Sequence, residues 1–182
     1  MRREKLQHQF MPENVIIPHF GMYDPIVGVE IGVLTGSGTL SMLKAIPGLT
    51  LYSIDPWLHL PDVPGEEHFE TALPQEVLDE NFRITKARTE EFWPRSILIR
   101  KFSDDAVKDV PDVIDYLFID GDHCYKQVVK DLKNYAPKVK AGGIVAGHDY
   151  IKQMGVAQAV QEYFKGKEIH YGDDDTWWVE IE

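Results

Sequence analysis

Acidic residues and histidines follow directly after two apolar segments of this chain. Asp120 and His123 follow one segment in FIDGDH, and His148 and Asp149 follow another in GHDY. A histidine with a pKa of about 6.5 can accept a proton at neutral pH. Carboxylates can instead hold a divalent cation that lowers the pKa of a hydroxyl group. The alternative is a purely structural role, in which Asp120 caps the next helix and His148 is a hydrogen-bonded loop residue. Titratable groups gathered at the ends of two segments favour a role in binding or catalysis over this alternative.

A glycine-rich turn follows an earlier apolar segment, in VEIGVLTGSG. Gly32, Gly36 and Gly38 are spaced G-x3-G-x-G, which differs from the G-x-G-x-x-G fingerprint of dinucleotide-binding folds. Glu30 lies just ahead of the turn, and its carboxylate would repel a phosphate held at the following helix N-terminus. The turn therefore favours a positively charged cofactor without phosphate, and S-adenosylmethionine meets both conditions. An ordinary strand–helix turn is the alternative.

A second acid, Asp55, ends the next apolar segment in YSIDPW. A carboxylate at this point can accept hydrogen bonds from both ribose hydroxyls of an adenosyl ligand, as it does in dinucleotide-binding folds. The alternative is an Asp that only caps the following turn. Glu30, the glycines and Asp55 together fit an adenosyl ligand that lacks phosphate.

Strand-like and helix-like segments alternate along the chain, which predicts a mostly parallel sheet covered on both faces. Ligands of such folds collect at the carboxyl ends of the strands. A final hairpin is expected around a solvated turn at residues 173–175. The expected strands are 26–33, 49–55, 96–102, 114–120, 144–146, 168–171 and 176–181, and the expected helices are 37–46, 75–92, 103–110, 125–139 and 156–164, with the helix at 103 capped by Ser103-Asp104-Asp105.

The chain resembles class I S-adenosylmethionine-dependent methyltransferases in VEIGVLTGSG, in SIDPW and in IDYLFIDGDHCYKQVVKDLKNYAPKVKAGGIVAGHDY. The last stretch is similar to a subgroup that includes macrocin-type and other macrolide-sugar O-methyltransferases and the cephalosporin-hydroxylase-like enzymes. The resemblance covers about residues 27–150. It implies an α/β, Rossmann-like, doubly wound seven-stranded sheet, mostly parallel, with a C-terminal antiparallel strand pair. The cofactor contacts that it implies are Glu30, Gly32, Gly36, Gly38, Asp55, Ser103 and Asp120, with Ser103 near the adenine.

The resemblance also implies chemistry at Asp120, His123, His148 and Asp149, which together are called the second cluster. Carried over to this chain, Asp120 and Asp149 become oxygen ligands of a divalent cation and His123 becomes the base, so that His123 and Asp120 are the expected catalytic residues. His148 stands where several relatives have a carboxylate, and it completes the expected ligand set. Because nitrogen is a poorer ligand than oxygen for magnesium, magnesium, manganese and no metal at all stay open.

The overall composition limits the partners that we expect. The 182 residues suggest a single domain over residues 1–182, and a net charge of −11 argues against nucleic acid and anionic membranes. One cysteine, no secretory signal and no apolar run of about 18 residues predict a cytoplasmic protein. Residues 1–20 form an N-terminal extension and the irregular segment 56–74 is expected to select the substrate. The sequence leaves a homo-oligomer open.

The predicted function is the S-adenosylmethionine-dependent methylation of a hydroxyl group on a small molecule, with a sugar as one candidate. Methylation of an amine or a carboxylate is the first alternative, and a cofactor-binding module without catalysis is the second. A nicotinamide oxidoreductase is disfavoured by the glycine spacing and by Glu30.

Overall fold

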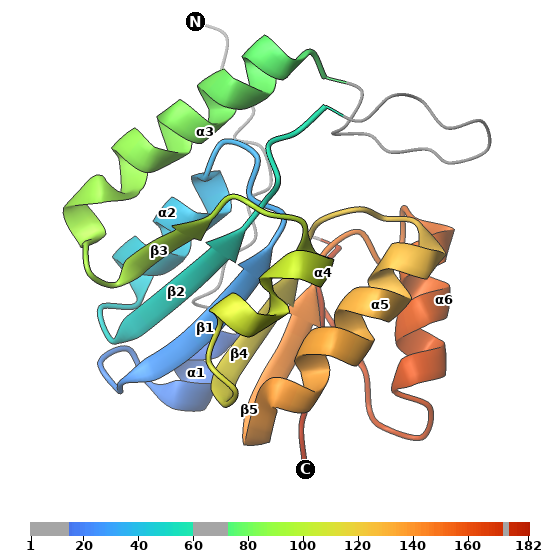
Figure 1. Cartoon of the computed structure of the whole chain (residues 1–182). Coiled ribbons are helices and arrows are strands. Elements are labelled where there is room, and N and C mark those ends of the chain that lie inside the picture. The colour runs from blue at the N-terminus through green and yellow to red at the C-terminus, as the bar shows by residue number, and fades with distance from the viewer. Residues whose placement is uncertain (1–14, 60–72, 173–174) are drawn as a thin grey trace, which may run out of the picture.

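The computed structural model describes residues 15–59, 73–172 and 175–182. These residues form one seven-stranded sheet with the strand order β3-β2-β1-β4-β5-β7-β6 (Figure 1). All pairs from β3 to β5 are parallel, and β7 runs antiparallel to both β5 and β6. The predicted fold class is therefore confirmed. The strands are β1 (Ile26–Ile31), β2 (Leu49–Ile54), β3 (Ser96–Ile99), β4 (Ile114–Ile119), β5 (Val139–Gly147), β6 (His170–Tyr171) and β7 (Trp177–Glu180).

The central strands β1 and β4 are mostly apolar and buried because both faces of the sheet are covered. In β4 every residue is buried: Leu117 and Ile119 belong to one core cluster, and Tyr116 and Phe118 belong to the other. This alternation follows from the two-residue period of a strand, which sends successive side chains to opposite faces. The central strands β1 and β4 therefore hold the two halves of the core together.

Helices cover both faces of the sheet (Figure 1). α5 and α6 pack together on one face with α4, and α1 and α2 contribute to the core cluster on the other face. α3 contacts α2 and lies near the turn that follows β1. The helices are α1 (Ile16–Phe20), α2 (Ser37–Ala45), α3 (Gln75–Thr89), α4 (Ser103–Ala106), α5 (Tyr125–Tyr135) and α6 (Met154–Tyr163), with 3-10 turns at Glu90–Phe92, Val107–Asp109 and Ala136–Lys138. Among the residues described, no helix has the length and apolar character that a membrane crossing requires.

The boundary between α5 and β5 differs from the prediction. The helix expected over 125–139 ends at Tyr135, and β5 begins at Val139 instead of 144. Pro137 lies in the intervening 3-10 turn, where it has no N–H to continue the helix. The Ala141-Gly142-Gly143 segment, expected to be a turn, lies inside β5, where an irregular register against β4 accommodates it.

The N-terminal and irregular segments are described in part. Residues 1–14 and 60–72, which make up most of the expected extension and of the segment 56–74, lie outside the described residues. Residues 16–20 form α1, which was not predicted, and Ile16 is fully buried in the core. This described part of the supposed extension is therefore integral to the fold.

Candidate active site

The turn after β1 needs glycine because other parts of the backbone approach it closely. Gly32 has a φ of 88°, and a Cβ placed there would lie 2.1 Å from the carbonyl oxygen of Asp120. Gly36 has a φ of 72°, and its Cβ would lie 2.7 Å from Cγ2 of Thr85 in α3. Only glycine adopts such a backbone without strain. The tips of β1 and β4 are thus in direct contact, which brings the turn beside the second cluster.

Glu30 lies beneath this turn. Its side chain is 2% exposed, and the hydroxyls of Thr39 and Ser53 donate hydrogen bonds to Oε2 at 2.5 and 2.9 Å. Burial raises its pKa from 4.5 to about 7, because a buried carboxylate loses its hydration. A Cβ on Gly38 would lie 3.0 Å from Oε1, so the carboxyl group supports the turn from inside. The contact of Glu30 with the cofactor stays a prediction, and its observed partners are the hydroxyls of Thr39 and Ser53.

Asp55 also holds the turn from within. Its Oδ2 accepts the backbone N–H groups of Val33 and Leu34, both at 3.0 Å, and its Oδ1 accepts the N–H of Trp57 at 2.7 Å. The residue is 4% exposed. These bonds occupy three of the roughly four acceptor positions of a carboxylate. The contact of Asp55 with a ribose stays a prediction, and its observed partners are backbone amides.

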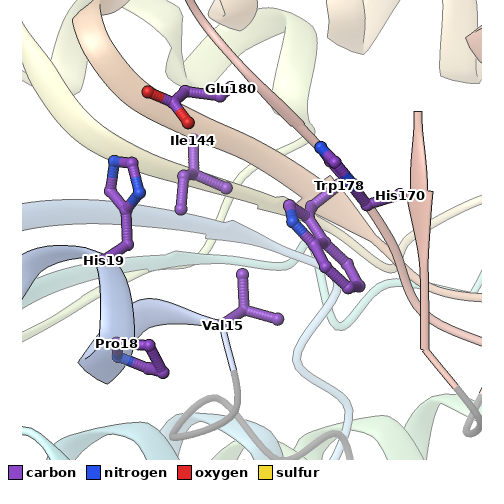
Figure 2. A pocket seen from close by; sticks show the side chains of 7 residues that line it. All are labelled: Val15, Pro18, His19, Ile144, His170, Trp178 and Glu180. Carbon is purple, nitrogen blue, oxygen red and sulfur yellow. The ribbon is translucent and has the colours of Figure 1, made fainter. Parts of the chain in front are cut away.

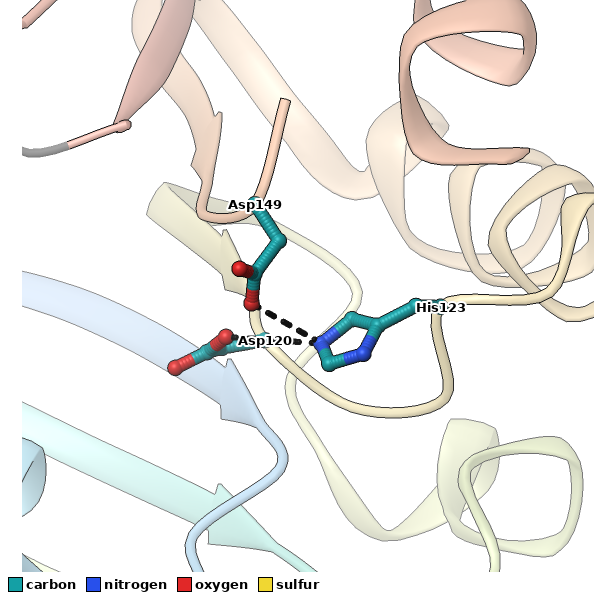
Figure 3. Close-up of side chains that lie close together, drawn as sticks. All are labelled: Asp120, His123 and Asp149. Carbon is teal, nitrogen blue, oxygen red and sulfur yellow. Dashed lines mark ion pairs between the residues drawn. The ribbon is translucent and has the colours of Figure 1, made fainter. Parts of the chain in front are cut away.

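The second cluster forms where β4 and β5 end side by side (Figure 3). His123 Nε2 lies 3.1 Å from Oδ2 of Asp149 and 3.9 Å from Oδ1 of Asp120. His148 Nδ1 lies 3.2 Å from the same Asp149 oxygen and 3.9 Å from the same Asp120 oxygen. The structure therefore brings together all four residues that the sequence singled out for chemistry.

The carboxylates change the protonation of this cluster. Asp120 and Asp149 raise the pKa of His123 to about 10, because they stabilise the charged ring. The pKa of Asp149 is held below its usual range by His123 and His148. Although His123 Nε2 is 3.1 Å from Asp149, it has no aligned hydrogen-bond partner. The two carboxylates therefore favour the charged imidazolium form of His123 as long as no cation compensates their charge.

The ligand atoms fit a divalent cation. Asp120, His123 and Asp149 each offer one atom, and these atoms all lie within 4.8 Å of one another. Two ligands about 2.1 Å from one ion lie roughly 3 to 4 Å apart, which matches the separations to Nε2 of His123. The sequence assigned His123 to the base and His148 to the metal. The ring nitrogens of both histidines lie 3.1 to 3.9 Å from the same Asp149 and Asp120 oxygens, so either histidine can supply the nitrogen ligand and leave the other to act as the base. Mixed oxygen and nitrogen donors suit manganese or zinc better than magnesium.

The comparisons with known proteins agree with this geometry. Residues 29–150 match the protein family described as "Methyltransferase domain". The chain belongs to this methyltransferase family. The match begins in β1 and ends just after Asp149, so it includes the glycine turn, Asp55 and the second cluster.

Two curated relatives and two solved structures resemble this methyltransferase domain. The uncharacterized protein y4gI of Sinorhizobium fredii (strain NBRC 101917 / NGR234) is 27% identical over 78% of the chain and 16% of its own length. The uncharacterized protein R132 of Acanthamoeba polyphaga mimivirus is 29% identical over 70% of the chain and 52% of its own length. The chain thus spans about half or less of these relatives.

The solved structures share the fold at low identity. The O-methyltransferase NovP has a TM-score of 0.66 at 23% identity, with 87% of this chain and 72% of NovP covered. The calicheamicin methyltransferase CalS11 has a TM-score of 0.65 at 19% identity, with 86% and 72% covered.

The sequence predicts that Ser103 caps α4 of the methyltransferase domain, and this prediction is wrong. Phe102 occupies the N-cap position and no side chain caps the helix. The Ser103 hydroxyl donates to Oδ1 of Asp131 in α5 at 2.6 Å and accepts from Nε2 of Gln127 at 3.1 Å. Burial raises the pKa of Asp131 to about 7. The cofactor contact of Ser103 stays a prediction, and sequence reasoning missed its bond to Asp131, which joins α4 to α5.

Asp175 is a second residue that sequence reasoning misjudged. Residues 173–175 were expected to form a solvated turn; 173 and 174 lie outside the described residues, but Asp175 is only 6% exposed. One signal could have indicated burial: Asp175 lies two residues before the strand β7, which begins with Trp177-Trp178. Its contacts are taken up below.

A cavity of about 260 Å³ lies away from the strand tips, between α1 and the strands β5, β6 and β7 (Figure 2). His19, His170, Trp178 and Glu180 are among the residues that line it. His19 is held by a 2.8 Å contact with the carbonyl oxygen of Gly142, and His170 stacks on Trp178. None of the predicted site residues lines this cavity.

Proposed function

We propose that this methyltransferase domain transfers the methyl group of S-adenosylmethionine to a hydroxyl group of a small molecule, with a sugar as the leading candidate. The observation that carries the proposal is the convergence of His123 and two carboxylates beside the glycine turn, at 3.1 and 3.9 Å. NovP is an O-methyltransferase and CalS11 is a TDP-rhamnose 3'-O-methyltransferase, and their similarity in fold supports a hydroxyl acceptor.

The cofactor would bind over the turn formed by Gly32, Gly36 and Gly38. Glu30 below the turn adds a negative potential when it is ionised, which suits the ammonium and sulfonium charges of the donor. Asp55 fixes the backbone of the turn and keeps one acceptor position for a ribose hydroxyl. Alignment of donor and acceptor can by itself supply several kcal/mol toward an in-line displacement.

The acceptor would meet the second cluster. Asp120, Asp149 and His148 would hold a divalent cation, which when bound lowers the pKa of the acceptor hydroxyl. His123 would accept the hydroxyl proton at Nε2. It can do so at neutral pH only when the charge of the two carboxylates is compensated, since these carboxylates raise its pKa to about 10. The raised pKa therefore links the proposed base to the proposed cation.

The binding part of this proposal is tested by thermal unfolding. S-adenosylhomocysteine at 100 times its dissociation constant should stabilise the domain by about 2.7 kcal/mol, and NAD should not change the melting temperature. Stabilisation by NAD and none by S-adenosylhomocysteine would contradict the proposal.

The catalytic part is tested by transfer of a labelled methyl group to panels of sugars, amines and carboxylic acids. His123→Gln should keep its affinity for S-adenosylhomocysteine while transfer falls by about 10² to 10⁴. His170→Gln, on β6, is the matched control and should retain full activity. Transfer only to amines or carboxylic acids would support the first alternative, and cofactor binding without any transfer would support a non-catalytic module.

A further inference from the structure

Asp175 is a charged residue that is almost completely buried. Its Oδ1 accepts the backbone N–H of Ile151 at 2.6 Å, and its carbonyl oxygen accepts the N–H of Tyr150 at 3.3 Å. These two N–H groups belong to the residues that directly follow Asp149 in the chain. One residue thus fixes the two peptide groups after a carboxylate of the second cluster.

The sheet explains why Asp175 reaches this position. β5 and β7 are antiparallel, with Gly147 opposite Trp177. Asp149 lies two residues beyond Gly147, and Asp175 lies two residues before Trp177, so both lie just past the same end of the pair. The contact is therefore a consequence of the strand register.

The backbone of Asp149 needs such support. Its φ is 59°, in the left-handed region that non-glycine residues enter at a penalty of about 1 kcal/mol or more. A strained residue of this kind persists only when its surroundings hold it. The bonds from Tyr150 and Ile151 to Asp175 provide this restraint. In this conformation Oδ2 of Asp149 lies 3.1 Å from Nε2 of His123.

Lys152 joins the two carboxylates on the outer side. Its Nζ lies 3.3 Å from Oδ2 of Asp175 and 4.0 Å from Oδ1 of Asp149. The lysine side chain is 65% exposed, so solvent screens both ion pairs. The restraint on Asp149 therefore rests mainly on the hydrogen bonds that the N–H groups of Tyr150 and Ile151 donate to Asp175.

We propose that Asp175 is a positioning residue of the acceptor site: it holds the turn after β5 so that the Asp149 carboxylate faces His123. The inference rests on the proposed function only in that Asp149 and His123 act on the acceptor. It assigns a role at this site to a residue of the β6–β7 hairpin. In the sheet, this hairpin lies on one side of β5, and β4, which carries Asp120 at its end, lies on the other side.

The test measures the position of Asp149 without turnover, from the NMR resonances of the His123 ring at one fixed pH in metal-free buffer. Asp149→Asn sets the scale of the change. Asp175→Gly removes the side chain without straining the positive φ of 71°. Asp175→Gly should shift the His123 ring resonances by more than about half of the shift that Asp149→Asn causes. It should also speed hydrogen exchange of the Ile151 amide roughly ten-fold.

Asp175→Asn keeps an Oδ1 acceptor and should restore the wild-type behaviour, with a change of less than about a quarter of the scale and an exchange rate within about three-fold. Asp112→Gly, at an exposed position, is the matched control and should change neither signal. If Asp175→Gly fails to fold, Asp175→Glu replaces it with the same expectation, because the extra methylene displaces the acceptor oxygen.

The inference is overturned if the His123 resonances do not shift in Asp175→Gly, or in Asp175→Glu where that variant replaces it. It is equally overturned if Asp175→Asn shifts these resonances as far as that variant does. It is also overturned if that variant loses stabilisation by S-adenosylhomocysteine, since the role would then be general support of the fold. A wild-type protein without any response to S-adenosylhomocysteine would instead refute the proposed function. The His123 resonances still decide the role of Asp175 in that case.

Discussion

Replacing Glu30 by glutamine is expected to make the domain more stable at high pH, relative to wild type, and a weaker cofactor binder. Glu30 is fully buried and its pKa is raised from 4.5 to about 7. A shift of that size corresponds to about 3 kcal/mol, at ~1.36 kcal/mol per unit. Below pH 4.5 the carboxyl group is neutral in both the folded and the unfolded state. As the pH rises from 4.5 to about 7 only the unfolded state releases the proton readily, so the free energy of unfolding falls by this amount and stays low above pH 7.

Glutamine does not titrate and can still accept the hydrogen bonds of Thr39 and Ser53. The free energy of unfolding of Glu30→Gln minus that of wild type should therefore grow by about 2 kcal/mol between pH 5.5 and 8.5, the part of the titration that falls in this window. Urea denaturation at several pH values measures this difference. Asp131 is also buried with a raised pKa, but it is present in both proteins and cancels.

The exposed Glu91→Gln variant is the matched control, and its difference from wild type should stay flat with pH. A flat difference for Glu30→Gln, within about 0.5 kcal/mol, would show that Glu30 does not titrate as a buried acid and would refute the reasoning. The same variant should bind S-adenosylmethionine more weakly, because it removes the negative charge under the turn. Unchanged affinity would mean that this charge does not serve the cofactor.

Three further substitutions test the rest of the site. Gly32→Ala should lower the free energy of unfolding, measured by urea denaturation, by more than about 3 kcal/mol. The control Gly142→Ala has a φ of 75° and open space around it, and it should cost only about 1 kcal/mol. Equal effects of the two variants would argue against the close contact of Gly32 with Asp120. Asp55→Ala should cost about 3 kcal/mol by leaving three amides unpaired and should abolish stabilisation by S-adenosylhomocysteine; an unchanged melting temperature would contradict this role. Asp149→Asn should weaken Mn²⁺ binding, measured by calorimetry after chelation, by about ten-fold or more; equal affinity would exclude Asp149 as a ligand.

The main features of the fold could be predicted from local patterns. Apolar segments of six residues such as Ile114–Ile119, alternating with helical segments, indicated a parallel sheet covered on both faces, and β4 is buried throughout. The antiparallel C-terminal pair was expected and is present as β6 and β7. The end of α5 was predicted four residues too late, because a pattern of apolar residues continued through Val139 into the start of β5.

The members of the site could also be predicted, but not their partners. Asp120, His123, His148 and Asp149 converge because parallel strands end at the same edge of a sheet. The contacts of Glu30 with Thr39 and Ser53 and of Asp55 with Val33 and Leu34 could not be predicted, since these bonds join residues 9 to 23 positions apart. The same holds for Ser103 and Asp131, which are 28 positions apart.

The sequence by itself determined which residue types gather at the strand tips, because side-chain periodicity and glycine spacing are local properties that burial and backbone sterics select. Only the tertiary structure decided that Glu30 lies under the turn, that His123 groups with Asp120 and Asp149, and that Asp175 is buried against the segment after Asp149. Each of these depends on distances between distant segments. Such distances are fixed by strand register and packing, which no short stretch of sequence contains.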